Sequence, residues 1–136
     1  MKYPVVCLKE DDNMIYGFKD EDSLTIASKK LVDRGVFTNV NIVDSNGEIL
    51  KIKKVKELGW GTSFFGYSFK RNGRYIKIDF ETELLKIISL EEFKKDIVNR
   101  LVKSKYFNEA FSIPDVIKFI QNSSTIKDVI SFFSGN

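Results

Sequence analysis

The stretch that decides the fold runs from residue 63 to residue 81 and reads SFFGYSFKRNGRYIKIDFE. At its centre lies Asn72-Gly73, a dipeptide that accepts positive φ at both turn positions and favours a type I′ hairpin. A two-residue loop there pairs six apolar residues across the hairpin: Phe69 with Ile76, Tyr67 with Ile78, and Phe65 with Phe80. Side chains alternate along a strand, so these six share one face and the other face is mixed. A one-residue slip would bury charges, which predicts a firmly specified register.

Working outward toward the N-terminus, two short apolar runs predict a first hairpin. The strands are Tyr3–Lys9 and Met14–Phe18, joined by an acidic turn. The first run is apolar on both faces, which is typical of a central strand. A helix should follow, capped by Asp22 or Ser23 and stopped by Gly35. Its inward stripe is predicted to be Leu24, Ala27, Leu31 and Val32.

A second hairpin is predicted from Val36–Asp44 and Glu48–Leu58. A two-residue turn would oppose Ile42 with a lysine, whereas a three-residue loop opposes it with Leu50. We favour the three-residue loop, because it keeps apolar residues together and puts Gly47 in the left-handed position of a bulge. The apolar residues then change from even positions, Leu50 and Ile52, to an odd position, Val55, which predicts a further bulge or bend near Lys53-Lys54.

Beyond Glu83 the pattern becomes helical. Ser89 opens a capping-box sequence, and an apolar stripe with helical spacing continues to about Lys103. The tail holds two similar segments, each with a hydroxyl residue followed three positions later by Asp, which predict short helices over 113–121 and 126–133.

These elements predict one α+β domain over residues 1–136. Tight turns between strands imply a twisted, mostly antiparallel sheet of about six strands, with one helix after strand 2. A C-terminal group of helices should pack on one face, where it covers the apolar side of the sheet.

Composition narrows the function classes. The chain of 136 residues has a net charge of +3 and no histidine, so the commonest general base and metal ligand are missing. No phosphate-binding glycine loop and no zinc-ligand spacing occurs. We therefore expect a protein that is not an enzyme and has no cofactor. The single cysteine, Cys7, allows no internal disulfide, and neither a signal peptide nor an apolar membrane span is visible, which predicts a cytoplasmic protein with no membrane partner.

Two charged features have competing interpretations. Asp79 and Glu81 share a strand face and form the one candidate pair for acid–base chemistry, although pairing with lysines on a solvated face is the commoner arrangement. The lysine run over 51–56 could meet phosphates or an acidic partner, or could protect a strand edge from aggregation. We favour the structural interpretation in both cases.

An aromatic and basic surface is the predicted partner-binding site. Its residues are Trp60, Phe64, Lys70, Tyr75 and Lys77. The tryptophan could be a lid on the core or an exposed anchor, and tryptophan is enriched at binding hot spots. This surface would suit a protein partner or stacking on single-stranded nucleic acid, and helix cover on that side would cancel the idea.

The chain resembles the small bacterial immunity proteins that neutralise polymorphic or contact-dependent toxins. The resemblance rests on layout over residues 36–95. Its features are Asn-Ile-Val-Asp-Ser-Asn-Gly at 41–47, Trp60 with Phe65-Gly66-Tyr67, the strand at 74–80, and Ser89-Leu-Glu-Glu-Phe. It implies a non-enzymatic inhibitor that occludes a toxin's active site. The first functional hypothesis is therefore a protein-binding module with a toxin domain as partner, and the alternative is weak lysine-mediated nucleic-acid binding. The pattern predicts no oligomeric state.

Overall fold

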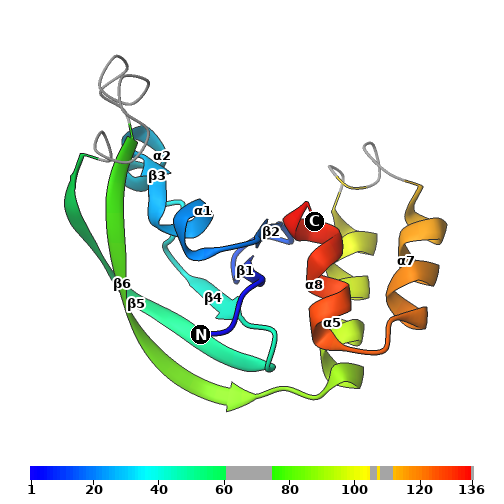
Figure 1. Ribbon diagram of the computed structural model, residues 1–136. Helices are drawn as coiled ribbons and strands as arrows, with labels where there is room; N and C mark the ends of the chain where they lie inside the picture. The colour runs from blue at the N-terminus through cyan, green and yellow to red at the C-terminus, as the bar shows by residue number, and fades with distance from the viewer. Residues whose placement is uncertain (61–74, 105–106, 108–111, 136) are drawn as a thin grey trace.

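The structure, a computed structural model, describes residues 1–60, 75–104, 107 and 112–135 (Figure 1). The described residues form six strands and five helices. In chain order the elements are β1 (Val5–Lys9), β2 (Ile15–Phe18), α1 (Glu21–Thr25), β3 (Ile26–Ser28), α2 (Lys29–Asp33), β4 (Val40–Val43), β5 (Glu48–Trp60), β6 (Tyr75–Ile87), α5 (Leu90–Lys103), α7 (Ile113–Asn122) and α8 (Ile126–Ser134).

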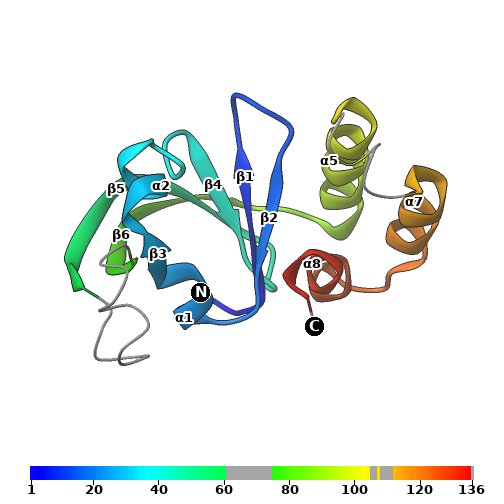
Figure 2. The ribbon, with the colours of Figure 1, turned by 90° about the horizontal axis from the view of Figure 1, so that it is seen from above.

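The six strands make one curled antiparallel sheet in the order β2-β1-β4-β5-β6-β3. Figures 1 and 2 show α5, α7 and α8 gathered beside β1 and β2, away from α1, β3 and α2. The predicted α+β class, with a C-terminal group of helices and a helix after strand 2, is confirmed. The central place of β1, between β2 and β4, is confirmed as well.

The helix predicted to run on to Gly35 is shorter than expected. α1 ends at Thr25, and the next three residues form β3, which pairs with Tyr75–Lys77 of β6. The β-branched pair Thr25-Ile26 is a weak helix former, and β6 offers a strand edge on which Ile26 can pair. Leu31, predicted to face inward, is consequently 47% exposed on the separate helix α2.

The hairpin of β4 and β5 has the predicted register. Ile42 lies opposite Leu50, and Gly47 has a φ of +83°. The buried Asp44 carboxylate fixes the turn, because one oxygen accepts from the backbone N–H groups of Asn46 at 2.9 Å and Glu48 at 3.0 Å. The predicted irregularity near Lys53-Lys54 is present as a register shift between Ile52 and Lys54.

The hairpin predicted around Asn72-Gly73 is not how β6 pairs. Ile76 lies between Trp60 of β5 on one side and Ala27 of β3 on the other, so its predicted pairing with Phe69 is wrong. Ile78 lies opposite Glu57, and Phe80 opposite Val55. The predicted partners Phe65, Tyr67 and Phe69 fall outside the described residues. β6 thus pairs with β5 over a long stretch, and not locally across a two-residue turn as predicted.

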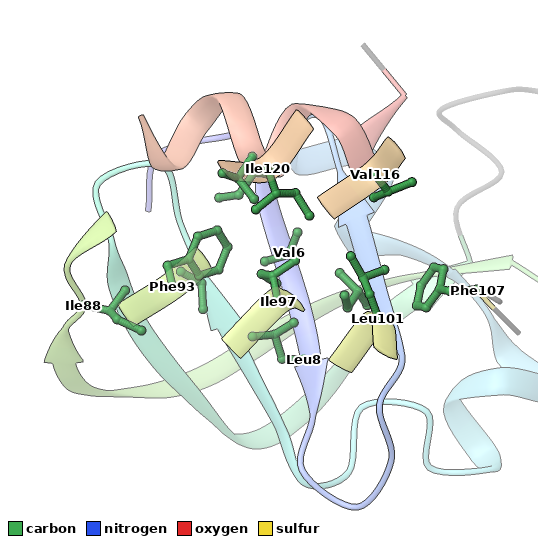
Figure 3. Close-up of a cluster of buried hydrophobic side chains, with 13 residues drawn as sticks. Val6, Leu8, Ile88, Phe93, Ile97, Leu101, Phe107, Val116 and Ile120 are labelled. Carbon is green, nitrogen blue, oxygen red and sulfur yellow. The ribbon is translucent and has the colours of Figure 1, made fainter. Parts of the chain in front are cut away.

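Two apolar cores lie on opposite faces of the sheet, because neighbouring residues of β1 alternate between them. On the helix face, Val6 and Leu8 pack with α5, α7 and α8 (Figure 3). The fully buried residues of this core include Phe93, Ile97, Leu101, Ile120, Val129 and Ile130. On the inner face, Val5 and Cys7 pack with Leu24, Val40, Ile42 and Ile52.

This arrangement corrects the predicted relation of helices to sheet. Ile76 and Ile78 are buried, as expected. They alternate in step with Phe80, which packs against the inner-face core, so they point away from the C-terminal helices. The C-terminal helices therefore cover the face of the sheet opposite to the one that Ile76 and Ile78 line.

Candidate functional site

The longest structural feature is the arm made by β5 and β6, two antiparallel strands of 13 residues each. β4 pairs only with Ile49–Lys51 of β5, and β3 pairs only with Tyr75–Lys77 of β6. Over the rest of their length, within the described residues, the two strands pair only with each other. The arm therefore presents strand edges and faces that the two cores do not bury.

The outer face of the arm is charged, and its charges are balanced across the strands. This face continues the helix face beyond the helices, because Ile49, which packs against the helix-face core, alternates in step with Lys51. Lysines of β5 lie opposite carboxylates of β6: Lys51 opposite Glu83, Lys54 opposite Glu81, and Lys56 opposite Asp79. Lys53 Nζ also lies 3.1 Å from a Glu83 carboxylate oxygen. Such exposed pairs contribute only about 0–1 kcal/mol each to stability. They matter mainly because they set the charge that a binding partner would meet on this face.

This pairing favours the structural interpretation of both charged features. Asp79 and Glu81, the candidate acid–base pair, are both exposed and both face lysines, which is the arrangement of a solvated strand face. The lysines in turn do not form a purely positive surface, since three of them lie opposite carboxylates. β5 does have an edge without a strand partner beyond Lys51, within the described residues, which agrees with the edge-protecting role of lysine.

Exposed apolar side chains gather near the end of β6. Leu84 is 54% exposed, Leu85 46% and Ile87 68%. Leu85 is the extra residue of a bulge, because Leu84 lies opposite Leu50 while Lys86 lies opposite Ile49. Every residue from Glu81 to Ile87 is exposed. We call Glu81–Ile87, on the side of β6 away from β5, the open edge.

The predicted partner-binding residues are only partly placed. Tyr75 and Lys77 are exposed at the start of β6, opposite Ser28 and Ile26 of β3. Trp60 ends β5, and its side chain is not described; Phe64 and Lys70 lie outside the described residues. Three of the five positions lie close together in the sheet, because Trp60 pairs with Ile76, which stands between Tyr75 and Lys77 in β6. Lys77 and Ile87 are roughly 30 Å apart along the strand, at about 3.3 Å per residue.

Sequence reasoning missed the open edge, because the helical pattern was expected to begin just after Glu83. β6 instead continues to Ile87, and α5 begins only at Leu90. The signal was present in Leu84-Leu85-Lys86-Ile87: its apolar residues fit a strand as well as the first turn of a helix. Short apolar runs are ambiguous in this way.

An apolar cavity of about 330 Å³ lies near the other end of β6. Cys7, Leu24, Leu31 and Phe37 are among its lining residues, with Tyr75 also contributing. Burial raises the pKa of the Cys7 thiol to about 12, so this thiol stays protonated and is a poor nucleophile at neutral pH. The cavity therefore lacks the reactive group that a cysteine could supply.

A cleft of about 490 Å³ with both charged and apolar lining residues lies between β5 and the chain around α2. Lys29 of α2 forms ion pairs with Asp33, at 2.9 Å, and with Glu57 of β5. Hydrogen bonds to Glu57 and then to Asp33 raise the pKa of Lys29. These contacts attach α2 to the arm. They also pair Asp33 and Glu57, two of the acidic residues that line the cleft, with a lysine.

No cluster of three or more metal-ligating side chains occurs within the described part of the chain. The described helices are all too short or too polar to span a bilayer. Comparisons with protein-family models, with curated proteins and with solved structures find no match. The geometry of the arm is therefore the main guide to the function of this protein.

Proposed function

We propose that this protein is a cytoplasmic, non-enzymatic protein-binding module whose partner binds the arm at the open edge. The observation that carries the proposal is the exposure of Leu84, Leu85 and Ile87 within four residues at the end of one strand. Contiguous exposed apolar side chains rimmed by charges are typical of interaction sites. Glu81, Glu83 and Lys86 form that charged rim.

The resemblance to immunity proteins makes a toxin domain the partner to test first. Families of this kind are paired with their toxins in neighbouring genes, so the product of the adjacent gene is the candidate ligand. Tyr75 and Lys77, at the far end of β6, provide a second exposed region against which the open edge can be compared.

The experiment is a calorimetric titration of the neighbouring gene product into three forms of this protein. Leu84→Ser combined with Ile87→Ser should weaken binding at least tenfold, because truncating residues that act as hot spots costs more than about 1 kcal/mol each. Val102→Ser removes an equally exposed aliphatic side chain from α5 and should leave affinity unchanged. Lys77→Glu tests the alternative surface. Undiminished binding by the double variant would exclude the open edge.

Nucleic-acid binding through the lysine run is the weaker candidate, because carboxylates lie opposite Lys51, Lys54 and Lys56. Its test is a salt titration with single-stranded DNA. Phosphate contacts would make affinity fall steeply as salt rises. We expect no such salt-dependent binding.

A further inference from the structure

The backbone of the open edge has no strand beside it among the described residues. Alternate residues of such a strand point their N–H and C=O groups outward, where an added strand can accept and donate hydrogen bonds. Natural edges are usually blunted by lysine, proline or bulges. Here the bulge at Leu85 and the one lysine, Lys86, which is ion-paired with Glu92 of α5 at 3.2 Å, both lie toward the C-terminal end of the open edge. Residues 81–84 therefore have neither a lysine, a proline nor a bulge of their own.

The side chains flanking this edge alternate in chemistry. On the outer face, Asp79, Glu81 and Glu83 form a column of carboxylates. Phe80, Thr82 and Leu84 form the inward column, with Phe80 packed against the inner-face core. A strand laid beside β6 would place one set of its side chains next to the carboxylates and the other next to the largely apolar column. Charge complementarity favours lysine or arginine in the first set and aliphatic residues in the second.

A second copy of the chain is a poor occupant. Two copies of β6 paired antiparallel around a two-fold axis keep like faces together. Registers centred on Glu81 or Glu83 would then set carboxylates directly opposite carboxylates, which is destabilising. A foreign strand is free of this constraint.

We infer that the partner donates an extended segment of alternating basic and aliphatic residues, which pairs with the open edge of β6 as a seventh strand of the sheet. This inference rests on the proposed function and specifies how the partner binds. Backbone hydrogen bonds would supply affinity, and the carboxylate column would select basic residues.

The probe is a blocked nine-residue peptide that alternates lysine and valine, labelled with a fluorophore and titrated with the full-length protein. A second peptide replaces every lysine with glutamate. Two further peptides carry backbone N-methyl groups, one on all lysines and the other on all valines. Only one set of backbone N–H groups in an added strand faces β6, so one N-methylated peptide should lose binding and the other should bind within about threefold of the parent.

Protein variants test the charge selection. Glu81→Gln with Glu83→Gln should reduce the preference for the lysine peptide over the glutamate peptide by about threefold to tenfold, the size expected for two cross-strand charge pairs. The matched control, Glu91→Gln with Asp115→Asn, makes the same change in net charge on α5 and α7 and should leave the preference unchanged.

Three results would overturn strand addition. These are no binding of the lysine peptide at millimolar concentration, equal loss for both N-methylated peptides, or an equal effect of the control variant. If any of them occurs while the Leu84 and Ile87 substitutions still weaken partner binding, the proposed function stands and only the strand mechanism is wrong. If those substitutions also leave partner binding unchanged, both the proposed function and the strand mechanism are wrong.

Discussion

The helix-face core and the open edge are both built on strands whose side chains alternate between two faces. The apolar side chains are buried in the core and exposed at the open edge. In the core, Val6 and Leu8 of β1 meet Phe93 and Ile97 of α5, and all four are almost wholly buried. At the open edge, none of the described helices covers Leu84 and Ile87, and both side chains are more than half exposed. The difference indicates that stability is concentrated where the helices pack. The Glu81–Ile87 part of the arm has exposed side chains and is held mainly by backbone pairing with β5, so it is available for contact.

The largest expected effect lies in the core. Phe93→Ala should lower the free energy of unfolding by about 3–5 kcal/mol, because it removes a fully buried aromatic ring and leaves a cavity. Val102→Ala, on the same helix but exposed, should change it by less than about 0.5 kcal/mol. Urea denaturation of both variants measures the contrast. Similar losses for the two would mean that α5 does not pack as described.

The contact between β2 and α8 should be nearly as sensitive. A Cβ at Gly17 would lie 2.2 Å from the backbone carbonyl carbon and oxygen of Phe133, so Gly17→Ala must displace α8. Overpacking of this kind typically costs about 1–3 kcal/mol. Thermal and urea unfolding will measure the loss. Gly59→Ala is a useful comparison, because its added methyl would meet no atom of the described residues within 4 Å, so the change tests mainly backbone strain at a φ of +128°. A stable Gly17→Ala protein would contradict the close approach of α8.

A smaller effect should depend on pH. The Cys7 pKa is about 12 in the folded protein against an ordinary 9.0. Between these values the unfolded chain loses the thiol proton and the folded chain keeps it, so stability is retained below about pH 9 and falls as pH rises. The slope is about 1.4 kcal/mol per pH unit at most. From pH 8 to pH 10, the wild type should lose about 1.4 kcal/mol more than Cys7→Ala does. Parallel losses in the two proteins would show that the thiol is not buried.

The smallest effect on stability is expected at the open edge. Leu84→Ser and Ile87→Ser should each change the free energy of unfolding by less than about 0.5 kcal/mol, since both side chains are mostly solvated already. Denaturation of the double variant provides the measurement. A loss comparable to that of Phe93→Ala would place these residues in the core and remove them as a binding surface.

Local signals predicted much of this fold. Gly47 set the register of β4 and β5, and Ser89 and Thr125 cap their helices through hydrogen bonds to the backbone N–H groups of Glu92 and Asp128. These features depend on residues close together in the chain, where turn and cap chemistry is decisive.

What the sequence did not reveal depends on long-range pairing. Asn72-Gly73 is a strong turn signal, yet Ile76 pairs with Trp60 and Ala27, residues that are distant along the chain. β3 interrupts a helix because β6 is beside it. The exposure of Leu84 and Ile87 was hidden for the same reason: an apolar run indicates burial until the partner elements are known.

The most direct test is hydrogen exchange of this protein alone and with the neighbouring gene product bound. Without the partner, backbone N–H groups of α5 should be far better protected than those of Thr82 and Leu84. Binding should slow exchange at Glu81–Ile87 and leave the start of β6, around Tyr75 and Lys77, little changed. Protection that appears at Tyr75–Lys77 or on the C-terminal helices, with the open edge unaffected, would contradict the account.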